Sequence, residues 1–165
     1  MTLKYKIQFL DYWHLSSGLS AGAKLDSTVT KDDDDIPYAS GKTIKGLVRE
    51  MIELETSDIK FLHQCYFTNA SLDKDTHKEI KTNQLQNNLY DVIASTKIEN
   101  GIAVDDSLRE IEVVIPIALY GEILDIQNDN DCKKLIQSLN LIKRMGLNRN
   151  RGLGRCEFKE IKCEN

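Results

Sequence analysis

The sequence predicts an α+β domain in which two helices pack against one sheet of four strands. Three observations support this prediction. The opening residues and the C-terminal residues alternate in the manner of strands, two stretches have the helical period, and the 165 residues are 41% hydrophobic. Such a length and composition fit one soluble globular domain over residues 1–165. The predicted order is strand, helix, strand, strand, helix, strand.

The first element is a strand near the N-terminus. Its apolar residues occupy every second position, as in a strand with one buried face, at Leu3, Tyr5, Ile7 and Phe9. Residues 11–41 then form a long loop excursion, because they contain three glycines, several serines, the acidic run 32–35 and Pro37. Loops longer than about 12–15 residues in compact domains are usually functional or disordered, so we expect more than a connector.

The next element is an amphipathic helix over residues 43–55. Apolar side chains recur there at helical spacing, at Ile44, Leu47, Val48, Met51 and Ile52. Lys42, Lys45 and Arg49 lie at its start and outside that stripe, where side chains and free backbone N–H groups can bind an anion. The alternative is a helix start with solvated lysines. A nucleotide-binding P-loop is excluded, because Ile36 stands where that pattern requires glycine.

The middle of the chain predicts two strands separated by an insertion. His63 to Asn69 is a plausible short strand, and the polar, weakly periodic residues 73–100 are expected to project. Apolar residues of one parity then predict a long strand from Ile111 to Ile123. Pro116 removes a backbone donor within it, which implies an edge strand or a bulge.

The last two elements are a helix and a strand. Residues 131–145 predict the second helix, and Gly146 is well placed to cap its C-terminus. Residues 155–161 alternate again and predict the final strand. The full order corresponds to a ferredoxin-like (RRM-like) βαββαβ fold, with a long loop before the first helix and an insertion between the middle strands.

Charge is distributed unevenly along the chain. The net charge of −4 excludes a uniformly basic nucleic-acid-binding coat. Residues 143–162, however, carry seven basic and two acidic side chains, a local charge of +5, which leaves −9 for the remainder. This polarity predicts an anion-binding face formed by the C-terminal end.

Cysteine usage and hydropathy bear on the compartment and on metals. The four cysteines form no CxxC pair and have no histidine cluster nearby, so no zinc is expected, and we interpret them as thiols in a reducing cytosol. The apolar runs are short and the N-terminus lacks the apolar core of a signal peptide. A cytoplasmic protein without a membrane partner is therefore expected.

The glycine-rich loop, residues 146–155, carries the sharpest functional signal. Its glycines alternate with arginines, at Gly146, Arg149, Arg151, Gly152, Gly154 and Arg155. Glycine lets a backbone approach a phosphate chain, and the arginine fork binds phosphate oxygens in pairs. These residues predict nucleic-acid binding, and the alternative is a structural loop with exposed arginines.

Three stretches of the chain together resemble the RAMP superfamily of CRISPR-associated proteins. They are IPYASGKTIKGLVREM at 36–51, TKIENGIAVDDSLREIEVV at 96–114 and GLNRNRGLGRCEF at 146–158. The family's proline-containing approach to the first helix is matched by Pro37, Gly41, Lys45, Gly46 and Arg49. Its glycine-rich loop is matched by Gly146, Arg149, Arg151, Gly152, Gly154 and Arg155.

This resemblance implies a backbone subunit of a type III CRISPR effector complex, of the Csm-like or Cmr-like kind. The expected partners are guide RNA, target RNA, other effector subunits and further copies of the chain in a filament. The palm would be ferredoxin-like, and a hairpin thumb that inserts between guide and target bases would fall within residues 73–110. At 165 residues the chain is short for such a subunit.

Family members also cut target RNA with an aspartate in the loop before the proline. Asp26, eleven positions before Pro37, matches by spacing, and the acidic run 32–35 is the competing assignment. The resemblance thus implies a metal-dependent endoribonuclease. A loop carboxylate could hold a divalent cation such as Mg²⁺ or orient the attacking ribose 2′-hydroxyl.

Two alternatives to target cleavage remain open at this point. One is a catalytically silent structural or capping subunit of the same kind of complex. The other is a guide-processing ribonuclease that uses His14 as a general acid or base, as relatives in the superfamily use a histidine near the end of the first strand. A structural or RNA-stacking role for His14 competes with the second alternative.

Overall fold

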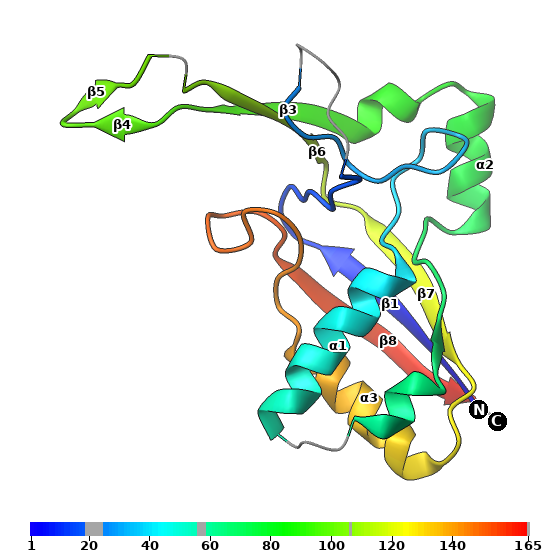
Figure 1. The fold of residues 1–165 in the computed structure, drawn as a ribbon. Coiled ribbons are helices and arrows are strands. Elements are labelled where there is room, and N and C mark those ends of the chain that lie inside the picture. The colour runs from blue at the N-terminus through cyan, green and yellow to red at the C-terminus, as the bar shows by residue number, and fades with distance from the viewer. Residues whose placement is uncertain (19–24, 56–58, 106, 165) are drawn as a thin grey trace.

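A computed structural model of the protein describes residues 1–18, 25–55, 59–105 and 107–164 (Figure 1). Its main sheet has four antiparallel strands in the order β2-β7-β1-β8. Their bounds are Thr2–Phe9 for β1, Tyr66–Phe67 for β2, Ala118–Leu124 for β7 and Cys156–Glu164 for β8. Helices α1 (Gly41–Glu55) and α3 (Asp129–Leu141) cover one face of this sheet. The predicted α+β class is confirmed.

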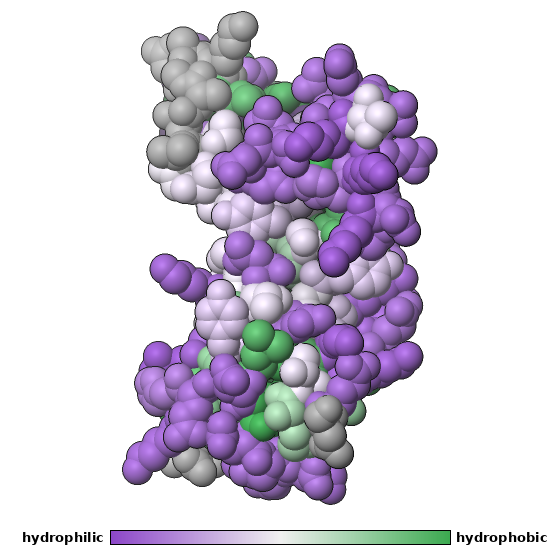
Figure 2. Space-filling view, turned by 90° about the vertical axis from the view of Figure 1, so that its right-hand side faces the viewer, coloured by the Kyte–Doolittle hydropathy of each residue, from purple (hydrophilic) through white to green (hydrophobic). Residues whose placement is uncertain are grey.

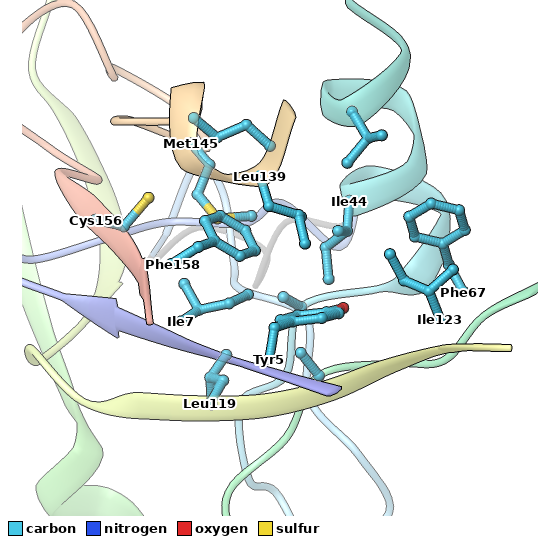
Figure 3. Packing of buried hydrophobic residues seen from close by; sticks show 14 of the residues in the cluster. Tyr5, Ile7, Ile44, Phe67, Leu119, Ile123, Leu139, Met145, Cys156 and Phe158 are labelled. Carbon is cyan, nitrogen blue, oxygen red and sulfur yellow. The ribbon is translucent and has the colours of Figure 1, made fainter. Parts of the chain in front are cut away.

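The core lies between this sheet and the two helices. Alternate residues of β1 face it, and Ile7 lies opposite Leu119 of β7 and Phe158 of β8. Figure 3 shows these side chains packed against residues of the two helices above the sheet, among them Ile44 of α1 and Leu139 of α3. Tyr5 lies opposite Gly121, and a side chain at position 121 would meet the Tyr5 hydroxyl, so the glycine makes room for the ring.

The predicted long strand from 111 to 123 is wrong, because the chain breaks into two strands that belong to different sheets. β6 (Arg109–Val114) pairs with β3 (Tyr90–Ser95), whereas β7 begins at Ala118 and pairs with β1. Pro116 lies in the break, where its missing N–H costs no ladder hydrogen bond. The proline signal was therefore correct, but it marks the end of one strand and not a bulge within it.

The expected cap at Gly146 is also wrong. Helix α3 ends at Leu141, and Ile142 is already extended. The chain between the helix and the glycine-rich loop runs beside the start of β8 instead. The backbones of Arg144 and Arg155 form an antiparallel β-bridge, and the Lys143 carbonyl accepts a hydrogen bond from the Cys156 N–H.

The insertion between the middle strands has more structure than its sequence indicated. It contains α2 (Lys74–Thr82), the 3₁₀ turn η2 (Gln86–Leu89), β3, β4 (Ile98–Glu99) and β5 (Ile102–Ala103), whereas the 3₁₀ turn η1 (Lys60–His63) comes before β2. Strands β3 and β6 form a long hairpin that projects from the main sheet, with β4 and β5 toward its tip (Figure 1). The name hairpin below means residues 90–114.

Helix α2 packs on the acidic run of the long loop. His77 contacts the Asp32 carboxylate at 2.9 Å, and Lys81 pairs with Asp34 at 2.7 Å. Asp32 also accepts hydrogen bonds from the N–H groups of Asp34 and Ile36. Burial raises the pKa of the Asp32 carboxyl, but these hydrogen bonds together outweigh it and hold that pKa below its usual range. Asp32 and Asp34 of the acidic run therefore have a structural function.

The interpretation of all four cysteines as thiols is wrong for two of them. Cys132 at the start of α3 and Cys163 near the end of β8 form a disulfide. Cys65 and Cys156 are free and buried, and burial raises the pKa of the Cys156 thiol to about 12. Neither free thiol is activated for chemistry. Within the described ranges, no helix is both long and apolar enough to cross a bilayer.

Candidate functional site

The glycine-rich loop is fixed to the domain at both ends. Leu147 donates its N–H to the His14 carbonyl at 2.8 Å, and Gly154 donates to the Tyr12 carbonyl at 2.8 Å. A Cβ at Gly154 would overlap the Met145 carbonyl oxygen, so that glycine is required by packing. Gly152, by contrast, has φ +95° and open space around it. Of the two glycines predicted to approach RNA, Gly152 presents the accessible backbone.

The three arginines of this loop differ in how far their charge is already neutralised. Arg155 forms an ion pair with Asp11 at 3.3 Å, and Arg149 lies 3.7 Å from the Glu50 carboxylate on α1. Within the described part of the chain, the Arg151 side chain has neither an ion pair nor a hydrogen bond. Arg151 is therefore the loop cation most available to a ligand.

Arg151 lines a cleft between the glycine-rich loop and the hairpin. The cleft has a volume of about 540 Å³ and is lined by Ser95, Thr96, Lys97, Val104, Asp105, Ser107, Arg109 and Arg151. Three cations and four hydroxyl or carboxyl side chains make this lining polar, with one acidic residue among them. Cations and hydroxyl donors on an open surface suit the phosphates and riboses of a nucleic acid.

The sequence analysis missed the contribution of the hairpin to this cleft. Arg109 lies opposite Ser95 in the hairpin, and the Ser107 hydroxyl contacts the Thr96 hydroxyl and accepts the Lys97 N–H. The available signal was a group of small hydroxyl residues beside two cations within an otherwise weakly periodic insertion. Only the fold brings that group next to a loop about fifty residues later in the chain.

The basic residues of α1 are not gathered into the same cleft. The Lys45 ammonium donates to the Cys65 carbonyl at 2.9 Å, and Arg49 pairs with Glu53 at 2.8 Å. Both line a separate pocket of about 260 Å³ beside η1, together with His63. Lys45 lies about 140° around the helix from Glu50, which the glycine-rich loop contacts.

The start of α1 is largely satisfied by the protein itself. Ser40 accepts a hydrogen bond from the Thr43 N–H, and Asn69 accepts one from the Gly41 N–H. A Cβ at Gly41 would overlap the Phe67 carbonyl, so Gly41 serves the contact between α1 and β2. The expected anion site at this helix start is thus reduced to the exposed side chain of Lys42.

Asp26 lies at the edge of the hairpin, beside β6. Its own N–H donates to the Glu110 carbonyl at 2.8 Å, and its carboxylate accepts the Glu110 N–H at 2.8 Å. Ser27 continues the contact by forming a parallel bridge with Ile111. Asp26 is nevertheless exposed, so its carboxylate remains accessible to a ligand. Glu110 follows the cleft residue Arg109 directly, which places the aspartate one strand away from the cleft lining.

His14 is fully buried beneath this segment. Its Nδ1 contacts the Glu112 carbonyl at 2.5 Å, and its Nε2 lies 3.0 Å from the Ser27 hydroxyl. The carbonyl can only accept, so Nδ1 carries a proton, and Nε2 shares a hydrogen bond with the Ser27 hydroxyl. A buried imidazole with both nitrogens occupied cannot reach a scissile phosphate, which argues against guide processing by His14.

Asp26 offers an exposed carboxylate to a divalent cation. In the described ranges, no three or more histidine, cysteine, aspartate or glutamate side chains are grouped to hold a metal. Mg²⁺ commonly takes one or two protein carboxylates and completes its shell with water and substrate phosphates. Asp26 fits that limited role, with the other ligands supplied by RNA and water.

The face that carries α2 and the β2 edge is largely hydrophilic. Figure 2 shows that hydrophilic side chains cover most of it, and hydrophobic ones are visible only in small separate areas. The described residues on that face therefore present no extended apolar surface to a partner. The cleft and the Asp26 segment remain the strongest candidates for function.

Comparison with known proteins identifies relatives by fold. No family model matches the chain, and no curated protein matches its sequence. A chain from the cryo-EM structure of type III-B Cmr-beta bound to cognate target RNA matches with a TM-score of 0.73 and 9% identity, over 96% of both chains. A chain from type III-B Cmr-beta in the apo state matches with a TM-score of 0.70 and 10% identity, again over 96% of both.

These matches cover the projecting hairpin as well as the sheet and its helices, since almost the whole of each chain is aligned. At such low identity they establish shared architecture. The protein therefore has the fold of a chain of the type III-B Cmr-beta complex.

Proposed function

We propose that this protein is a guide-RNA-binding backbone subunit of a type III CRISPR ribonucleoprotein. The observation that carries the proposal is the cationic cleft between hairpin and glycine-rich loop, with Asp26 held on the strand that forms one wall of that cleft. The strand order β2-β7-β1-β8 and the two covering helices fit a ferredoxin-like palm, and the projecting hairpin fits a thumb.

The proposed grip on RNA is electrostatic and independent of base sequence. Arg151 contacts a phosphate directly, while Arg149 and Arg155 exchange their carboxylate partners for phosphate oxygens. Gly152 lets the backbone approach the same strand. Lys42, Lys45 and Arg49 would contact a more distant part of the RNA, along α1. Base pairing between guide and target then supplies the specificity.

The proposed cleavage uses Asp26 as an acceptor for the proton of a target ribose 2′-hydroxyl. The 2′-oxygen attacks the adjacent phosphorus, the bond from phosphorus to the 5′-oxygen breaks, and that oxygen takes a proton from water. The products are a 2′,3′-cyclic phosphate and a 5′-hydroxyl. A bound Mg²⁺ would stabilise negative charge on the phosphate. The hydrogen bond from the Glu110 N–H would hold the Asp26 carboxylate in place beside the hairpin.

The decisive variant is Asp26→Asn in the assembled complex. Asparagine keeps an oxygen that can accept the Glu110 N–H, so the segment stays in place while the charge is lost. We expect target cleavage to be abolished and guide binding to be unchanged. The matched control is Asp33→Asn, because Asp33 is exposed in the same long loop and should leave cleavage intact.

The same experiment separates the proposal from its alternative. If Asp26→Asn cleaves target at the normal rate, the subunit is catalytically silent and serves as a structural or capping member of the complex. Chelation of divalent cations should stop cleavage if the proposal is correct. The proposed partners are other effector subunits and further copies of the chain, arranged as a filament on the guide.

A further inference from the structure

The long loop and the hairpin are joined by a compact polar network that the proposed chemistry does not use. Its members are His14, Ser27, Lys31 and Glu112, and it lies directly beside Asp26. His14 and Glu112 are 0% and 8% exposed, which is rare for residues of this polarity. Buried polar groups of this kind are stable only when each is paired.

Each member of the network fixes the loop to β6. His14 connects the Glu112 carbonyl to the Ser27 hydroxyl. The Glu112 carboxylate accepts the Val29 N–H at 3.0 Å through one oxygen and the Lys31 ammonium at 2.8 Å through the other. Lys31 also lies 4.0 Å above the ring of Tyr90 on β3. The hydrogen bonds of the His14 ring and of the Glu112 carboxylate thus all join the long loop to β6.

We propose that His14 and Glu112 are positioning residues that hold the Asp26 carboxylate at a fixed place on the hairpin. The inference rests on the proposed function, because it concerns the acid that the proposal assigns to cleavage. Among the described residues, Asp26 contacts β6 through Glu110, by one backbone hydrogen bond and one that its carboxylate accepts. Both lie in an exposed position, and hydrogen bonds exposed to water are easily broken. The buried network one residue further along supplies the rigidity that the exposed contact lacks.

A second consequence follows from where the network is anchored. Glu110 and Glu112 belong to β6, and β6 with β3 forms the hairpin. Asp26 is therefore attached to the hairpin rather than to the main sheet, so both keep a constant relation to any RNA that the hairpin contacts. Misplacement of a catalytic group by about 1 Å can reduce a rate about a hundredfold.

The test removes the hydrogen bond between His14 and Ser27 by changing each of the two residues in turn. Ser27→Ala deletes the hydroxyl, while His14→Asn deletes the Nε2 contact and retains an amide that can donate to the Glu112 carbonyl. Ser27→Thr restores a hydroxyl and should restore activity. Ser138→Ala is the matched control, since it removes another buried hydroxyl, bonded to the Lys134 carbonyl in α3, far along the chain from Asp26.

Two readouts are measured on these variants. Hydrogen exchange of the free full-length chain reports on the Asp26 and Val29 amides, which are bonded to the Glu110 carbonyl and the Glu112 carboxylate. Target cleavage by the guide-loaded complex reports kcat and KM separately. We expect about tenfold faster exchange at these amides and a kcat reduced by about tenfold to a hundredfold, with KM and guide binding unchanged.

The double variant Ser27→Ala/His14→Asn should be no worse than either single variant, because both remove one link. Unchanged exchange at the two amides in both single variants would overturn the inference, whatever happens to cleavage. So would faster exchange with a normal kcat in a complex that Asp26→Asn inactivates. Faster exchange combined with normal cleavage by Asp26→Asn would instead refute the proposed function and leave the anchoring role of His14 intact.

Discussion

Arg151 gives the most quantitative test of the proposed RNA grip. Its guanidinium lines the cleft and has no partner among the described residues, whereas Arg149 must first give up Glu50. A charge-assisted hydrogen bond contributes about 1.5–3 kcal/mol, so Arg151→Ala should weaken guide binding by about tenfold or more at low salt. Arg149→Ala should weaken it less, because removing that side chain also removes a competing ion pair.

The salt dependence gives a second magnitude for the same variant. If about five phosphates are neutralised, log K should fall with a slope of about −3.5 against log salt for single-stranded RNA. Loss of one phosphate contact should bring the slope to about −2.8. The assay is fluorescence anisotropy with labelled RNAs of unrelated sequence across a salt series. All sequences should weaken similarly, since phosphate contacts carry no base information.

Lys133→Ala is the control for net charge. Lys133 is an exposed lysine on α3, and its replacement changes the total charge by the same amount as Arg151→Ala. We expect its affinity and slope to match those of the wild type. An Arg151→Ala variant that binds with wild-type affinity and slope would refute the assignment of the cleft to RNA.

Further predictions concern stability. Gly154→Ala should destabilise the fold by about 2–5 kcal/mol, because the new Cβ meets a carbonyl at φ +71°, whereas Gly152→Ala, in open space, should lose only about 1–2 kcal/mol in urea titrations. Tyr5→Phe should stabilise by about 1 kcal/mol and raise Tm by about 2–4 °C, since the Tyr5 hydroxyl (Figure 3) is buried and has no hydrogen-bond partner among the described residues. A lower Tm would show that this hydroxyl is paired in solution. The lowered pKa of Asp32 means that its contribution is present above the ordinary carboxyl pKa and is lost as the pH falls through the lowered value, below about pH 4. Asp32→Asn should therefore flatten the acid limb of a stability profile measured by denaturation, and an unchanged limb would contradict this.

The first strand and helix α1 could be predicted from the sequence because their signals are local. Alternation at Leu3 to Phe9 and the apolar stripe of α1 report directly on which side chains are buried. Helix α2 escaped prediction because Ile80 is the one buried side chain among its described residues, so it has almost no apolar stripe. Its place is decided by ion pairs to a loop more than forty residues earlier, which periodicity cannot indicate.

The candidate site was only partly predictable for the same reason. The arginines and glycines of the glycine-rich loop were visible as a local pattern, and Asp26 was found through the family resemblance. The charges of Glu110 and Glu112 looked alike in sequence, yet Glu112 is buried and Glu110 is not. That difference arises when the long loop packs against β6, and it depends on contacts between residues about eighty positions apart.

The central claim is that this chain binds guide RNA within an effector complex. The most direct test is to purify the tagged protein from its native host at low salt and to sequence the RNA that accompanies it. The account predicts discrete RNAs of uniform length that share one repeat-derived 5′ tag. Recovery of the intact protein without such RNA would contradict the claim, and the cleft beside the glycine-rich loop would then require a different ligand.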